Sequence, residues 1–389
     1  DGHVWAERYD RDLNDIFALQ DEISEAIVKA LKLKLLPEEK KAIEDRGTKN
    51  LEAYDFYLRG NSVYAQMGYE NTIRAAELLR NALALDPAFS LARRSLARIL
   101  RVLIYVTPVD RTSARQELED LIEGGILEAK DLALSHYWRG VQNMRRHDWF
   151  GAEQAFDRSI SLSPGSETGL IDSRRELLQY VGRMTDAIDL GRELVRNDPL
   201  SLIQSSWLQA TLSALGRASE EEIEFERTRT LSGDHMAIEL TRLQRIWPDS
   251  APAERRNQLQ RILASGVFTS GYVLRLEDVF DQPNAARGVL RQAFADLRDK
   301  AVTDVMRIAL LAGLFSDIEL ALDCLNRAYV DLDFPEGNRL WAPAFAEARK
   351  RPRFKDLIRE LGIYDYWRKS GKWGDFARAK GDDDFEITR

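Results

Sequence analysis

The first strong pattern of apolar and polar positions lies near the start of the chain. Apolar residues recur at helical spacing from Ile16 to Leu35, with acidic residues early in the run and lysines late. This period and this order of charges are typical of an amphipathic helix, which Pro37 would end. The preceding segment, Val4 to Tyr9, has the apolar and aromatic residues of a short strand. We therefore expect a strand followed by a long helix at the N-terminus.

A second pattern repeats with a period near 34 residues, roughly the length of one helical hairpin. Each copy carries a small residue, then a larger apolar residue, then a further small or apolar residue, and a proline after that. The copies are Ala75…Leu79…Ala82…Pro87, Trp149…Ala152…Phe156…Ser159…Pro164 and Gly182…Ala187…Leu194…Pro199. Small residues allow the two helices of a hairpin to pack closely, and proline ends the second helix. The pattern predicts consecutive helical hairpins.

Related blocks, Tyr57-Leu58-Arg59-Gly60 and Tyr137-Trp138-Arg139-Gly140, stand in the first halves of two copies. The first block lies farther from its proline than the second, which predicts a longer turn around Gly68. Residues 201–232 form a weaker copy, in which Glu221 stands where a small residue is expected. Residues 302–335 match better, residues 236–300 are helical in pattern without a clear repeat, and residues 106–130 are interpreted as an insertion.

These repeats resemble the tetratricopeptide repeat. The resemblance implies an all-α fold, a helical-hairpin solenoid that winds as a right-handed superhelix. The composition agrees, since 44% of the residues are hydrophobic and only 23 Gly and 11 Pro occur in 389 residues. Hairpins need few breakers, whereas a protein of strands and turns would need many.

The N-terminal run Gly2 to Leu35 resembles the end of a TolB-N-terminal-like (FlgO-like) domain. In bacterial proteins of that kind the segment leads into tetratricopeptide repeats, and a class III nucleotidyl cyclase or a winged-helix domain often lies upstream. Because residue 1 is Asp rather than Met, we expect a processed or truncated chain. The predicted organisation is residues 1–36 as the end of that domain, 50–235 as repeats, 236–349 as further degenerate repeats, and 350–389 as a cap with an acidic tail.

The C-terminal stretch resembles the closing segment of the same repeat proteins. Those relatives carry cysteines where this chain has Ala377 and Ile387, so a disulfide is not possible there. The segment is rich in aromatic residues, which can cap the apolar end of the last hairpin or, alternatively, dock a partner. They are Trp341, Phe345, Phe354, Tyr364, Tyr366, Trp367, Trp373 and Phe376. Asp382-Asp383-Asp384 is expected to be a solvated tail.

Charge and candidate chemistry narrow the function classes. The formal net charge is −8, which gives no general positive field for nucleic acid. The single cysteine, Cys324, falls in an apolar helical stripe and is expected to be an inert core thiol. The histidines His3, His136, His147 and His235 lack metal-ligand spacing, and no phosphate-binding loop or nucleophile motif occurs. We expect no enzyme activity, no metal and no cofactor.

Arginines at helical spacing give the best binding candidate. Arg94, Arg98 and Arg101 recur at i, i+4 and i+7, opposite an apolar face. Tyr57 and Tyr64 on one side and Arg145 on the other could extend this stripe within a concave groove. Arginine with tyrosine suits an acidic peptide or a terminal carboxylate. The alternative is an ordinary solvated face.

Four functions stay open at this point. The first is a non-enzymatic scaffold that binds a protein or an acidic peptide in its groove. The second and third are the regulatory C-terminal half of a class III cyclase or of a winged-helix transcription activator, and the fourth is a small-molecule sensor. No apolar run reaches the length of a membrane span. We expect a cytoplasmic location, or a periplasmic one if a signal or membrane anchor lies upstream.

Overall fold

The computed structural model describes most of the chain after residue 46. The described residues are 47–66, 68–106, 111–127, 132–162, 168–232, 236–264, 271–297, 302–334 and 336–388. The strand and helix predicted within residues 1–36 lie outside these ranges, as do Pro164, His3 and His235. The chain divides into two compact units, Asp1–Leu100 and Arg101–Arg389, which are described separately below.

The first unit is built on one helical hairpin. Helix α3 (Leu51–Ala65) packs against α4 (Tyr69–Leu85), and the first part of α5 (Ser90–Val106) follows. The Asn50 side chain caps α3 by accepting hydrogen bonds from the backbone N–H groups of Glu52 and Ala53. The repeat residues Ala75, Leu79 and Ala82 have no exposed surface. They form the core of this hairpin, as the repeat pattern predicts.

The turn of this hairpin is not longer than that of the related one. It comprises residues 66–68, and the turn between α7 (Leu132–Arg145) and α8 (Trp149–Leu162) comprises residues 146–148. The prediction of a longer turn around Gly68 is therefore wrong. The additional residues between the block glycine and the proline extend the second helix instead, since α4 has 17 residues and α8 has 14.

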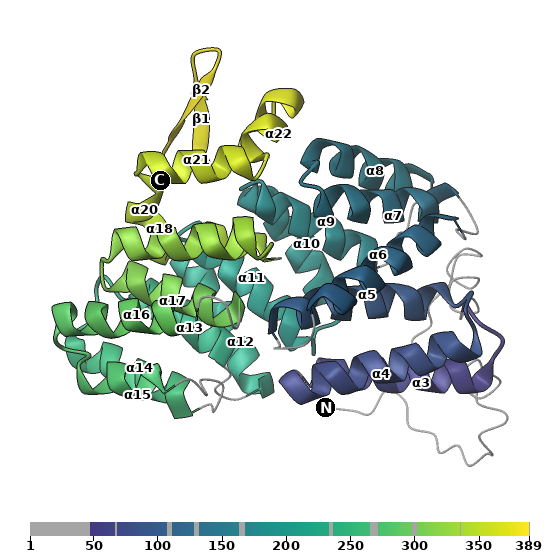
Figure 1. Cartoon of the computed structure of the whole chain (residues 1–389), viewed down its shortest axis with the longest axis horizontal. Helices are drawn as coiled ribbons and strands as arrows, with labels where there is room; N and C mark the ends of the chain where they lie inside the picture. Colours follow the sequence, from purple (N-terminus) through teal and green to yellow (C-terminus); the bar gives the residue numbers. More distant parts are fainter. Residues whose placement is uncertain are drawn as a thin grey trace, which may run out of the picture. The chain divides into compact units, whose positions relative to one another are not determined.

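The second unit continues as an array of helix pairs (Figure 1). Helix α6 (Arg111–Leu127) packs on α7, and the pairs α7 with α8, α9 with α10, and α11 with α12 follow in chain order. The bounds of the later members are α9 (Thr168–Tyr180), α10 (Met184–Asn197), α11 (Leu202–Ala214) and α12 (Ala218–Ser232). Residues 111–127, within the segment 106–130 that is interpreted as an insertion, thus form a helix that packs on α7.

The region without a clear sequence repeat also forms helix pairs. These are α13 (Met236–Ile246) with α14 (Pro252–Ala264), α15 (Tyr272–Asp278) with α16 (Pro283–Leu297), and α17 (Val302–Leu314) with α18 (Ile318–Asn326). The described part of the chain is therefore an all-α array of consecutive hairpins, and the predicted helical-hairpin solenoid is confirmed. Only the C-terminal segment departs from it.

Close packing at glycine marks the hairpin interface. Gly140 of α7 is buried, and a Cβ there would fall 2.5 Å from Cδ1 and 2.9 Å from Cζ of Phe156 on α8. Gly60 of α3 faces Leu79 of α4 in the same way, with a Cβ position 3.0 Å from Cγ. Both glycines end the Tyr-x-Arg-Gly blocks of the sequence. Those blocks therefore set the distance between paired helices.

The C-terminal segment combines short helices with a β-hairpin. After the π-helical turn Arg327–Asp331 come α19 (Gly337–Leu340), the 3-10 turn Pro343–Phe345, α20 (Ala346–Arg349), α21 (Pro352–Glu360) and α22 (Ile363–Ser370). Strands β1 (Ala377–Lys380) and β2 (Asp384–Ile387) then pair antiparallel, with Ala377 opposite Ile387. The sequence reasoning did not anticipate this hairpin. Asp382 and Asp383 are exposed at its turn, whereas Asp384 forms ion pairs with Lys355 and Arg359.

The predicted aromatic cap covers more than the last hairpin. Helix α21 contacts α18, and α22 contacts α8, which is far earlier in the chain (Figure 1). Three indole N–H groups donate to backbone oxygens between the C-terminal segment and α8, α9 or the turn after α9: Trp149 to Leu361, Trp341 to Gln179 and Trp367 to Val181. Six of the eight predicted cap aromatics are buried. Their burial favours the capping role over a partner-docking role.

Candidate partner-binding surface

Four of the six residues predicted to bind a partner lie in the first unit. Tyr57 and Tyr64 belong to α3, and Arg94 and Arg98 belong to α5. The guanidinium carbon of Arg98 lies 5.2 Å from the centre of the Tyr64 ring, within the range of a cation–π contact. Together with Asn61 we call these residues the Arg–Tyr surface.

Asn61 of α3 fixes the arrangement of the two helices. Its Oδ1 accepts hydrogen bonds from Arg98 Nη2 at 3.3 Å and from Ser95 Oγ at 3.0 Å, and its Nδ2 donates to the Tyr57 backbone oxygen at 3.1 Å. The sequence reasoning missed Asn61. Its position one helical turn after Tyr57 and just before Tyr64 was the available signal.

The Arg–Tyr surface places two arginine charges close to the partly buried Tyr57. Burial raises the pKa of the Tyr57 hydroxyl, against the opposing positive charges of Arg94 and Arg98. The Tyr57 ring packs against the buried ring of Phe89, and the two ring centres are 5.1 Å apart. Arg98 is exposed, and no carboxylate among the described residues lies within ion-pair distance of it. Its contacts with Tyr64 and Asn61 on this surface are with neutral groups.

The remaining two arginines have acidic partners within the second unit. Arg101 forms an ion pair with Glu176 of α9, and Arg145 Nε donates to Glu119 of α6 at 2.7 Å. The arginine side chains are exposed by only 20% and 15%. The structure therefore brings Tyr57, Tyr64, Arg94 and Arg98 together, and it engages Arg101 and Arg145 with acidic side chains of the chain itself.

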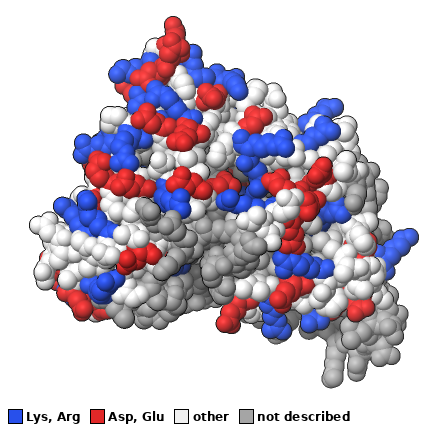
Figure 2. All heavy atoms as spheres, viewed as in Figure 1, with Lys and Arg blue, Asp and Glu red and all other residues white. Residues whose placement is uncertain are grey.

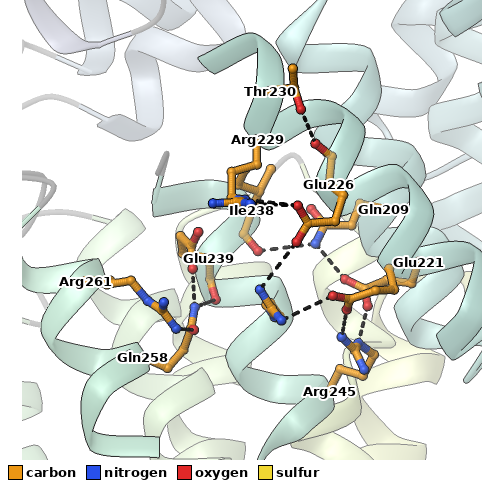
Figure 3. Close-up of polar contacts among 12 residues, drawn as sticks. Gln209, Glu221, Glu226, Arg229, Thr230, Ile238, Glu239, Arg245, Gln258 and Arg261 are labelled. Carbon is orange, nitrogen blue, oxygen red and sulfur yellow. Dashed lines mark hydrogen bonds and ion pairs between the residues drawn. The ribbon is translucent and has the colours of Figure 1, made fainter. Parts of the chain in front are cut away.

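Glu221, which departs from the repeat pattern, is the centre of a buried polar cluster (Figure 3). This α12 side chain has no exposed surface, accepts a hydrogen bond from Gln209 Nε2 at 2.6 Å and forms an ion pair with Arg245 of α13. Burial raises the pKa of Glu221, although the Gln209 hydrogen bond and the Arg245 charge act against it. Arg245 also pairs with Glu222.

The cluster continues into the next hairpin. Gln258 of α14 donates from Nε2 to the side chain and backbone oxygen of Glu239 on α13, and Arg261 Nη2 donates to Gln258 Oε1 at 2.6 Å (Figure 3). Glu239 and Gln258 are fully or almost fully buried. The polar cluster thus joins α11, α12, α13 and α14, and its burial assigns it to the packing of the array rather than to a surface site.

Among the described residues, no group of three or more His, Cys, Asp or Glu side chains is placed to hold a metal ion. Cys324 is buried, and burial raises the pKa of its thiol well above the ordinary range, as expected for an unreactive thiol. His147 stacks on Trp149 with ring centres 5.3 Å apart. It lies 3.5 Å from the Asp333 carboxylate.

Charge is mixed on the face of the molecule drawn in Figure 2. Acidic and basic side chains alternate over it, and neither sign forms one continuous area. On the described part of this face the acidic residues therefore form no single patch. None of the described helices combines the length and the apolar character needed to cross a membrane.

One curated protein and one solved structure are similar to this chain over the lengths given below. No family model matches the chain. A putative adenylate cyclase 3 of Rhizobium meliloti (strain 1021) is 43% identical over 98 residues, which is 25% of this chain and 17% of that protein. The chain thus aligns with about a sixth of this relative. A chain from the crystal structure of the APC/C hetero-tetramer Cut9-Hcn1 aligns with 91% of this chain and 73% of its own length, at 16% identity and a TM-score of 0.38.

Proposed function

We propose that this chain is a protein-interaction module that binds an acidic segment of a partner on the Arg–Tyr surface. The observation that supports the proposal most directly is the position of Arg98. It is exposed, stacks on Tyr64 and is fixed by Asn61, so its planar N–H groups are oriented before a ligand arrives. An oriented guanidinium loses less conformational entropy on binding a carboxylate than a free one.

A few strong contacts would supply the binding energy. A hydrogen bond between charged groups contributes roughly 1.5–3 kcal/mol. Two such contacts, at Arg94 and Arg98, with a tyrosine beside each, would anchor a short peptide. Arg101 and Arg145 belong to the proposed surface only if a ligand carboxylate replaces Glu176 and Glu119 as their partners.

Charge reversal tests the proposal. An acidic peptide rich in Asp and Glu, labelled with fluorescein, serves as the probe in a polarisation titration at low salt. The double variant Arg94→Glu/Arg98→Glu should bind it at least about 10-fold more weakly, since 1.4 kcal/mol corresponds to a factor of ten. Helical content measured by circular dichroism should not change.

A matched control separates local recognition from overall charge. Arg74 is an exposed residue of α4, and Arg74→Glu changes the net charge as Arg98→Glu does. Arg98→Glu should weaken binding, whereas Arg74→Glu should leave it nearly unchanged. Equal weakening by both variants, or unchanged affinity of the double variant, would reject the Arg–Tyr surface as the binding site.

The second candidate function is regulation of a cyclase that belongs to the same polypeptide. The similarity to a putative adenylate cyclase over 98 residues favours this possibility. The complete reading frame should be expressed with and without the region described here, and the formation of cyclic AMP from ATP measured. A change in rate or in its dependence on a partner supports the proposal. A reading frame without cyclase activity in either form contradicts it.

A further inference from the structure

One irregular segment of the chain lies along several first helices of the second unit. Helix α19 contacts α9 and α11, and the turn Pro343–Phe345 contacts α13 and α17. Each of these four helices is the first member of its pair. A single segment that reaches all four must follow the face that the first helices share. We call the described residues 332–334 and 336–349 the strap.

The strap approaches the helices closely enough to exclude other ligands. A Cβ on Gly337 would fall 2.5 Å from Cα and Cγ of Tyr180, and a Cβ on Gly313 of α17 would fall 2.9 Å from the backbone carbon of Ala344. Trp341 donates from its indole N–H to the Gln179 backbone oxygen at 2.9 Å. Backbone of the strap is thus in direct contact with helix surface at both ends of the face.

One arginine fixes the start of the strap to the array, and another links residues within the strap. Arg115 of α6 donates from Nη2 to the Leu332 backbone oxygen at 3.1 Å. Arg349 is 4% exposed and donates from Nη1 to the backbone oxygens of Trp341 and Ala342, at 3.3 and 2.9 Å. The strap, which consists of short helical turns, is therefore tied to α6 at its start and linked internally by Arg349.

Two features of the strap make its bound position energetically costly. Asn338 is 4% exposed, and its Nδ2 has no hydrogen-bond partner among the described residues. A buried donor without an acceptor opposes burial. Burial also lowers the pKa of Arg349 to about 10, which shows that its charge is disfavoured in this position. Release into water would relieve both costs.

We propose that the strap is an intramolecular ligand which keeps the first-helix face of the second unit closed, and that this face accepts an extended partner segment only after the strap is released. The partner segment would resemble the strap in chemistry, with a small residue facing Tyr180 and a tryptophan that donates to the end of α9. This face is separate from the Arg–Tyr surface, so either proposal can fail without the other.

Native-state hydrogen exchange on the unmodified chain tests the release. The amides of the strap should exchange together, in an opening that leaves the amides of α9 and α17 protected. If strap amides exchange only when the whole unit unfolds, the strap is a fixed part of the fold and the proposal is wrong.

Two substitutions of opposite effect test the occupation of the face. Gly337→Val places atoms against Tyr180 and should release the strap, whereas Asn338→Leu removes the unpartnered donor and should slow strap exchange by about 5- to 10-fold. The probe is a synthetic peptide of residues 332–349 with a fluorophore. It should bind Gly337→Val at least about 10-fold more tightly than the unmodified chain.

Lys350→Ala is the control, since Lys350 is exposed and pairs only with Glu347 at the surface of α20. It should bind the peptide as the unmodified chain does. Equal affinity of the peptide for Gly337→Val and for the unmodified chain would overturn the proposal. Should Gly337→Val fail to fold, the exchange experiment and Asn338→Leu decide alone.

Discussion

Replacing Gly140 by alanine tests the close packing that defines the hairpins. Two effects of opposite sign compete in this substitution. Alanine is favoured over glycine inside a helix by about 1 kcal/mol. Against this, the added Cβ would lie 2.5 and 2.9 Å from two atoms of the buried Phe156 ring, which is well inside van der Waals contact.

The structure decides which effect is larger. Relief of the overlap requires the Phe156 ring to move by about 1 Å, since ordinary contact begins at 3.4 Å, but the ring has no exposed surface toward which it could move. Adding atoms to a filled core costs about 1–3 kcal/mol, and an overlap with several ring atoms belongs near the upper limit. Subtracting the gain in helix propensity leaves a net loss of about 2 kcal/mol in the free energy of unfolding.

Urea denaturation followed by circular dichroism measures this loss as a lower midpoint at unchanged slope. Gly288 of α16 provides the matched control, because it is exposed and no atom lies within 4 Å of its Cβ position. Gly288→Ala should therefore raise stability by up to about 1 kcal/mol. Adding Phe156→Leu to Gly140→Ala should recover part of the loss, since the smaller side chain makes room. A Gly140→Ala variant as stable as the unmodified chain would refute the reasoning.

Three further predictions concern carboxylates. Glu153 is 4% exposed; burial alone would raise its pKa, but Lys372, Arg183 and Tyr366 hold it below the usual 4.5. The contribution of Glu153 to stability is present above pH 4.5 and is lost as the pH falls through the lowered pKa. Glu153→Gln should therefore lower the free energy of unfolding by about 2 kcal/mol at pH 7. It should also make the urea midpoint less dependent on acid pH. Glu221 has a raised pKa, so its ionisation opposes folding as the pH rises above 4.5. Glu221→Gln should therefore lower the free energy of unfolding by less than about 1 kcal/mol at pH 7. A loss equal to that of Glu153→Gln would contradict the raised pKa of Glu221. The Asp384 carboxyl, hydrogen-bonded to Lys355, should titrate by NMR with a pKa of about 2 and return toward 3.8 in Lys355→Met.

Local patterns in the sequence were sufficient to predict the helical hairpins. The small residues at 60, 75, 82, 140 and 152 are where the helices meet, because close helix packing excludes larger side chains there. The same logic singled out Glu221 as an exception, and the structure explains it by the buried partners Gln209 and Arg245. The neighbours Tyr64 and Arg98 were also predictable, since equivalent helices of adjacent hairpins lie side by side.

Long-range pairing was not predictable from local spacing. Glu176 lies 75 residues from Arg101 in the sequence, so nothing near Arg101 indicated that its charge has a partner. The strands β1 and β2 have four residues each, too few for an alternating pattern to be recognised. The strap follows no helical or strand period, and its binding to Tyr180 depends on surfaces that exist only after the helices have assembled.

The contact of the strap with α9 also affects how the chain acquires its structure. In a simple repeat array each hairpin contacts only its neighbours, so folding can proceed in step with synthesis. Here Trp341 and its acceptor on Gln179 are separated by 162 residues. At 5–20 residues per second, the ribosome needs roughly 8–30 s to make the intervening chain. During that time Tyr180 is stacked on Trp149 but lacks the cover of the strap, so we expect the nascent second unit to be a substrate for chaperones until the strap emerges.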